Sequence, residues 1–275
     1  MSNEINKTVD ISGNNNLLEP QKWVVSGNLL CKYMKKEEYL FEIVDRLAIV
    51  PRYNEEIISY LNVQEMESIS FPMVCFCDTP LHKVTEHKEN YGDYGIAFSK
   101  PSVVARGDVQ PILYLNVKSR LYLTLQTALS RLMNDGQLED NLEYLADSIL
   151  DFLLYTKPIE GFMPGKEQSM NFQDECEWRY IPPTPKDVEL VLPQYMNTEK
   201  GRDLGCKELI KEQDTWFRFE IDDVKYIIVP NKTSALNLIN HIENRKKIGD
   251  NIANRQIKDL LISKVTISAD LEGDM

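Results

Sequence analysis

The fold is decided by FPMVCFCDTPL (Phe71–Leu81), followed by HKENYGDYGIAFSK (His87–Lys100) and QPILYLN (Gln110–Asn116). Each stretch holds a short apolar run rich in aromatic and β-branched residues, and glycines mark the tight turns between the runs. This pattern predicts strands joined by short connections. The polar and aromatic side chains at the predicted strand ends exceed what folding alone requires, so we expect a site here. They are Asp78, His82, His87, Tyr91 and Tyr94.

Working outward, apolar residues at helical spacing predict a helix over residues 37–48, and the segment before it, 22–36, is typical of a strand. Two longer helical stripes over 118–133 and 137–155 flank the turn signal Asp135-Gly136, which predicts an antiparallel helical hairpin. The other predicted elements are a short helix at 55–61, strands at 72–77, 95–99 and 112–115, a short helix between the last two strands, a strand in DECEWRYIP (174–182), a β-hairpin of 216–220 with 224–229, helices at 234–247 and 255–263, and a strand at 264–267.

The order of these elements predicts an α+β fold. Strands and helices alternate without a regular βαβ period, and the chain carries neither GxGxxG nor GxxxxGK[ST], so a Rossmann domain or a P-loop NTPase is not expected. We predict a mixed or antiparallel sheet core in one domain over residues 21–275, with a helical-hairpin insertion at about 118–156. Residues 1–20 are polar and predict a disordered tail.

Composition narrows the classes of function. The net charge of −12 disfavours binding to nucleic acid or an anionic membrane, because those surfaces attract clustered Lys and Arg. No apolar run approaches the roughly 20 residues needed to span a bilayer, and the N-terminus has no secretory character. The five cysteines suit buried thiols in a reducing compartment. We therefore expect a cytoplasmic protein with no membrane segment.

DECEWRY (Asp174–Tyr180) is the most pointed chemical motif. On a strand, Glu175, Glu177 and Arg179 share one face, while Cys176, Trp178 and Tyr180 share the other and are expected in the core. Two carboxylates in a row with a guanidinium can orient a ligand or supply a general base, with Glu177 as the candidate catalytic residue. We expect Glu177 within reach of Arg179 or of a tyrosine in YGDYG. The structural alternative is a salt-bridge row that supports a neighbouring strand.

The other candidate residues lie in the segment before the YGDYG loop and in the loop itself, and most of them have both a functional and a structural interpretation. Asp78 either binds a ligand or caps a short helix that starts near Pro80. His82 and His87 are five residues apart, which does not suit a helical metal pair, and no metal site is predicted. Tyr91 and Tyr94 either stack on a planar ligand or shape a tight loop. GxSxG is absent, so no nucleophile elbow is predicted.

Taken in order, several segments resemble the AbiGi family of abortive phage-infection proteins. They are EEYLFEIVDRLAIVPRYNEE, PMVCFCDTPL, H-x₃-YGDYGIAFSK with PILYLN, DECEWRYIP, VKYIIVP and LLISKVTI, spread over Leu30–Leu271. The resemblance implies phage defence in a bacterial cytoplasm by an antitoxin-like component. It also implies a protein partner, a nucleotidyltransferase-like toxin or another effector of the same system.

A more distant likeness is to ADP-ribosyltransferase-like folds, in which a polar residue of the first strand and a late glutamate hold NAD. Here the first-strand step is Lys32-Tyr33-Met34 in place of a His-x-Thr step, and Glu177 would be the late glutamate. The favoured hypothesis is a non-catalytic protein-binding component with no cofactor. The alternative is a nucleotide-binding or ADP-ribosyltransferase-like enzyme that uses NAD or another nucleotide, with Lys32 among its ligand-binding residues.

Overall fold

The computed structural model describes residues 27–63, 66–78, 88, 90–107, 109–134, 148–165, 167–183 and 189–269. The predicted tail at 1–20, the histidines His82 and His87, and the Asp135-Gly136 turn lie outside these residues. Among the described residues, none of the helices combines the length and the apolar character that crossing a bilayer requires.

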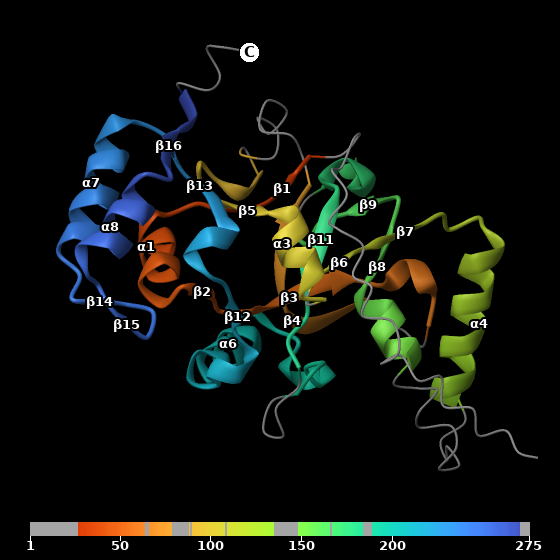
Figure 1. Cartoon of the computed structure of the whole chain (residues 1–275). Coiled ribbons are helices and arrows are strands. Elements are labelled where there is room, and N and C mark those ends of the chain that lie inside the picture. Colours follow the sequence, from red (N-terminus) through yellow and green to blue (C-terminus); the bar gives the residue numbers. More distant parts are fainter. Residues whose placement is uncertain are drawn as a thin grey trace, which may run out of the picture.

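An eight-stranded sheet forms the centre of the structure (Figure 1). Its order is β16-β13-β5-β1-β4-β11-β6, and β3 also pairs with β4. All the pairs are antiparallel except β13 with β16, so the prediction of a mixed sheet in an α+β fold is confirmed. The strands are β1 (Leu29–Met34), β3 (Arg52–Ile57), β4 (Ser68–Cys77), β5 (Tyr94–Ser99), β6 (Gln110–Pro111), β11 (Glu177–Tyr180), β13 (Val224–Val229) and β16 (Val265–Ile267).

One face of the sheet is covered by helices. Apolar residues of α1 (Glu37–Arg46), α7 (Lys232–Glu243) and α8 (Arg255–Ile262) pack with Phe76 and Trp178 of the sheet in the largest core cluster. Figure 1 shows the three helices grouped beside β13 and β16. The helical periodicity that predicted them is therefore explained by burial of one stripe of each helix.

The second face carries the predicted helical insertion. Leu129 of α4 (Arg120–Asn134) and Leu153 of the helical residues 148–154 join Phe71 and Met73 of β4 in a second cluster. These two helical segments pack on the sheet, and their connection as one hairpin stays a prediction. Its connecting residues, 135–147, lie outside the described part of the chain.

Shorter elements complete the fold. They are β2 (Ala48–Ile49), β7 (Leu113–Leu115), β8 (Thr156–Pro158), β9 (Glu160–Phe162), β10 (Ser169–Asn171), β12 (Phe217–Arg218), β14 (Lys247–Ile248), β15 (Asn251–Ile252), α3 (Lys100–Ala105), α6 (Glu199–Lys211), and the 3₁₀ turns η2 (Ser59–Leu61), η4 (Phe172–Glu175), η5 (Gln194–Met196), η6 (Gln213–Thr215) and η7 (Ile221–Asp223).

Two predicted elements are wrong. The helix predicted at 55–61 is replaced by the end of strand β3, which covers residues 55–57, and by the 3₁₀ turn η2 at 59–61. The pairing of β3 with β4 overrides the local helix preference of the glutamates. The hairpin of 216–220 with 224–229 does not form. η7 separates its arms, so that β12 pairs with β2 while β13 enters the main sheet.

Candidate functional site

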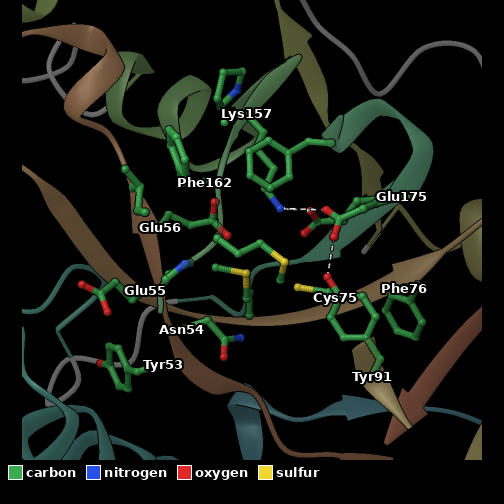
Figure 2. A pocket seen from close by; sticks show the side chains of 18 of the residues that line it. Tyr53, Asn54, Glu55, Glu56, Cys75, Phe76, Tyr91, Lys157, Phe162 and Glu175 are labelled. Atoms are coloured by element: carbon green, nitrogen blue, oxygen red, sulfur yellow. Dashed lines mark hydrogen bonds and ion pairs between the residues drawn. The ribbon is translucent and has the colours of Figure 1, made fainter. Parts of the chain in front are cut away.

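A pocket of about 740 Å³ opens on the face of the sheet that carries alternate residues of β4 and β11. It forms where two strands pair with different parts of β4: β3 pairs with Ser68–Met73, and β1 pairs at Cys77. Cys75 and Phe76, which lie between these pairings, line the pocket together with Lys32 of β1. The η2 turn and the β8–β9 segment supply further walls (Figure 2).

A network of charged side chains lies along the pocket. Lys157 of β8 donates from Nζ to Glu175 Oε2 at 2.9 Å and to Glu177 Oε2 at 3.2 Å. Arg179 Nε donates to Glu177 Oε1 at 2.6 Å, and its Nη2 donates to Glu56 Oε1 of β3 at 3.0 Å. The expectation that Glu177 reaches Arg179 is confirmed.

Aromatic residues and the backbone extend this network. Tyr91 donates a hydrogen bond from its hydroxyl to Glu175, and Figure 2 shows Tyr91 and Lys157 approaching that carboxylate from two sides. The Lys157 ammonium also lies 4.3 Å from the ring centroid of Phe172, and Arg179 Nη1 donates to the Leu154 carbonyl at 2.7 Å. Buried charges are tolerated only when they are paired in this way.

The opposite charges within the network stabilise the ionised forms of Glu177, Lys157 and Arg179. Burial raises the pKa of Glu177, but the positive charges of Arg179 and Lys157 outweigh burial and lower that pKa to about 2. Burial likewise lowers the pKa of Lys157, yet the carboxylates of Glu177, Glu56 and Glu175 raise it above its usual value. Arg179 is 0% exposed, and its pKa is raised for the same reason. Three carboxylates against two cations leave the network with a net charge of −1.

The DECEWRY motif differs locally from the strand that the alternation predicted. Glu175 ends the 3₁₀ turn η4, and the strand begins only at Glu177. Between them Cys176 has a left-handed backbone, with φ of 44°, and its side chain is exposed rather than in the core. The turn breaks the alternation, yet both carboxylates still reach the ammonium of Lys157. Trp178 and Tyr180 do lie in the core as expected.

Only some of the predicted site residues meet at the pocket. Lys32, Tyr91, Glu175 and Glu177 line it, and Arg179 lies directly behind Glu177.

Two other predicted residues lie elsewhere. Asp78 is ion-paired with the buried Lys100 and does not line the pocket. Burial raises the pKa of Asp78, and the Lys100 charge opposes that shift. Tyr94 packs against the helical face, where its hydroxyl lies 3.2 Å from Ser234 Oγ. His87 lies outside the described residues.

Sequence reasoning missed Lys157, Glu56 and Tyr60, which all line the pocket. Lys157 lies between the helix predicted at 137–155 and the Gly/Pro-punctuated loop predicted directly after it. Glu56 and Tyr60 lie in the segment predicted as a helix. A lysine flanked by the apolar LLYT and PI was the one available signal. Within the described ranges, no group of three or more His, Cys, Asp or Glu side chains is arranged to hold a metal ion.

The chain was compared with known proteins. A family model described as "Putative abortive phage resistance protein AbiGi, antitoxin" matches residues 47–230. "Abortive phage resistance protein AbiGi" of Lactococcus lactis subsp. cremoris is 33% identical over 252 residues, which cover 83% of this chain and 100% of that relative. No solved structure matches, so the expected likeness to ADP-ribosyltransferase folds has no support. The family model and the relative agree with each other and together span most of the chain, which therefore belongs to the AbiGi family.

Proposed function

We propose that this protein acts in abortive phage resistance by binding and restraining a protein partner, without catalysing a reaction itself. The defence role follows the name of its Lactococcus relative, and the partner follows the word antitoxin in the family description. The net charge of −12 suits contact with a basic protein surface.

The observation that carries the non-catalytic part of the proposal is the state of Glu177. Both of its oxygens accept hydrogen bonds from Arg179 or Lys157, and its pKa of about 2 keeps it ionised at neutral pH. A general acid or base works best with a pKa near the operating pH, and a ribose-holding glutamate needs an oxygen for its ligand. The pKa of Glu177 lies far below neutral pH, and its oxygens are almost fully buried against two cations, so Glu177 is better suited to hold the pocket together.

The cysteine of the pocket supports the same conclusion. Burial, followed by the charge of Glu177, raises the pKa of the Cys75 thiol, whereas a nucleophilic cysteine needs a lowered pKa. The same reasoning applies to Cys31, whose pKa is raised by its hydrogen bond with Cys77 and by burial.

The first test is co-purification. A tagged chain is expressed with the product of the neighbouring gene, and toxicity of that product is scored with and without the chain. We expect a stable complex and relief of toxicity. Two proteins that neither associate nor change each other's toxicity would remove the proposal.

The second test separates binding from catalysis by phage plating. Glu177→Gln is compared with Leu238→Ala, a variant of a fully buried core residue in α7 that is remote from the pocket and expected to lose about 2–5 kcal/mol of stability. If the chain is not an enzyme, the loss of phage protection in each of the two variants should match that variant's loss of folding stability. Loss of protection in Glu177→Gln alone, at equal melting temperature, would assign Glu177 a chemical role.

A further inference from the structure

Glu56 is the carboxylate of the network with capacity left for a ligand. Its Oε1 accepts from Arg179, and among the described residues none donates to its other oxygen. Its side chain is 17% exposed and lines the pocket. By contrast, Glu175 and Glu177 each have both oxygens engaged and are almost fully buried. Among the three carboxylates of the network, Glu56 is therefore the one that a molecule in the pocket can reach.

Tyr60 of η2 also lines the pocket, and its hydroxyl lies close enough to Glu56 to be affected by that charge. It is buried, and no described residue hydrogen-bonds to it. Burial raises the pKa of Tyr60, and Glu56 is the nearby charge that raises it most. A buried hydroxyl without a partner costs about 1–3 kcal/mol, so a ligand that bonds to it recovers that free energy.

The charges around the pocket favour a positively charged group. The buried network carries a net charge of −1, as shown above. Glu55 is paired with Arg202 at 3.2 Å, which leaves that pair neutral. Lys32 and Glu160 also line the pocket, and their formal charges cancel in the sum. The walls add apolar and aromatic surface, including Met73 and the 53% exposed Phe162. Aromatic faces attract desolvated cations.

We propose that this pocket binds a protonated amine or guanidinium group carried on a slim apolar chain. The cation would donate to the open oxygen of Glu56 and to the oxygen of Tyr60, while its chain contacts the exposed ring of Phe162. Two sources present this chemistry: a free small amine or guanidine, and a lysine or arginine side chain of the partner protein. This binding site is independent of the proposed restraint of a partner, because binding of a small cation can be measured on the isolated chain.

The probes are n-butylguanidinium and n-butylammonium, with butyrate and inorganic phosphate as anionic controls, measured by calorimetry and thermal melting. A probe at about ten times its Kd should raise the Tm by about 2–3 °C for a chain of this size. We expect the cations to bind and the anions not to bind. Absence of heat and of any Tm shift with both cations, or binding of the anions alone, would overturn the proposal.

Three variants locate the binding group. Glu56→Gln should weaken cation binding by about tenfold or more, and Tyr60→Phe by about fivefold, because each loses one hydrogen bond to the ligand. Glu208→Gln, at an exposed ion pair on α6, is the matched control and should bind as the original chain does. Tyr60→Phe removes an atom with no protein partner, so it should fold even if Glu56→Gln does not. Unchanged affinity in Tyr60→Phe would overturn the placement of the cation.

The last arm separates the two sources and the two proposals. If the group belongs to the partner, saturating butylguanidinium should release the co-purified partner. If it belongs to a free small molecule, the complex should persist. If the original chain binds its partner but binds neither probe, the pocket assignment is overturned and the proposed function stands. If the original chain binds the probes but forms no complex, only the proposed restraint of a partner is overturned.

Discussion

Glu177→Gln should destabilise the protein by an amount that depends on pH. The pKa of the Glu177 carboxyl is about 2 in the folded protein, against an ordinary value of 4.5 for glutamate. Each pKa unit corresponds to about 1.36 kcal/mol, so ionisation of Glu177 contributes about 3 kcal/mol to stability. A similar cost, about 3–5 kcal/mol, is expected when one member of a buried ion pair is removed, because Arg179 and Lys157 lose their shared partner.

The sign of the pH dependence follows from the direction of the shift. Because the folded pKa is lowered, the stabilisation is fully present above about pH 4.5 and is lost as the pH falls toward 2. The difference between the original chain and Glu177→Gln should therefore shrink from about 3 kcal/mol at pH 7 to about 1 kcal/mol at pH 3.

Urea unfolding at both pH values measures this difference, with Glu208→Gln as the control. That exposed glutamate pairs with Lys211, and its loss should cost no more than about 1 kcal/mol. A Glu177→Gln difference below about 1 kcal/mol at pH 7, or one that is equal at both pH values, would refute the assignment of Glu177 as the buried centre of the network.

Three further changes test the packing around the pocket and the fold. Lys157→Met should cost about 3–5 kcal/mol in urea unfolding, because it leaves Glu175 and Glu177 without their shared cation, and a cost under 1 kcal/mol would contradict the buried network. Gly92→Ala should lower the Tm more than Gly107→Ala does. Both glycines have positive φ, but a Cβ at Gly92 would clash with the Met34 carbonyl oxygen, whereas Gly107 faces open space. Equal effects of the two substitutions would argue against this close approach. Asn231→Ala should cost about 1 kcal/mol by removing the cap of α7, and Asn231→Asp should restore the stability; failure of that rescue would show that the side chain does not act as a cap.

Local patterns were sufficient wherever an element is defined by one buried face. The helical stripes predicted α1, α7 and α8, because each of these helices buries the side that its own sequence spacing marks. A stripe also predicted α4, and the continuous apolar run ending at Cys77 predicted β4, which is buried on both of its faces. The two-residue spacing of Glu177 and Arg179 likewise placed both on one face of a strand.

Elements whose state depends on distant partners were not predictable in this way. β3 is a strand because it forms hydrogen bonds with β4. β12 does not form the predicted hairpin with β13, because it pairs with β2. Cys176 adopts a left-handed backbone that alternation cannot anticipate, and the turn there moves Glu175 off the strand.

The sequence by itself determined the class of fold, most of the helices, the glutamate–arginine pair and the membership of the AbiGi family. Only the tertiary structure decided which groups form the site. Lys157 joins Glu175 from 18 residues away, and Glu56 joins Arg179 from 123 residues away. The physical reason is that a buried charge must be compensated where it lies in space, and the compensating groups come from whichever segments the sheet brings together. For that reason the open oxygen of Glu56 and the hydroxyl of Tyr60 become a candidate binding site only in the folded chain.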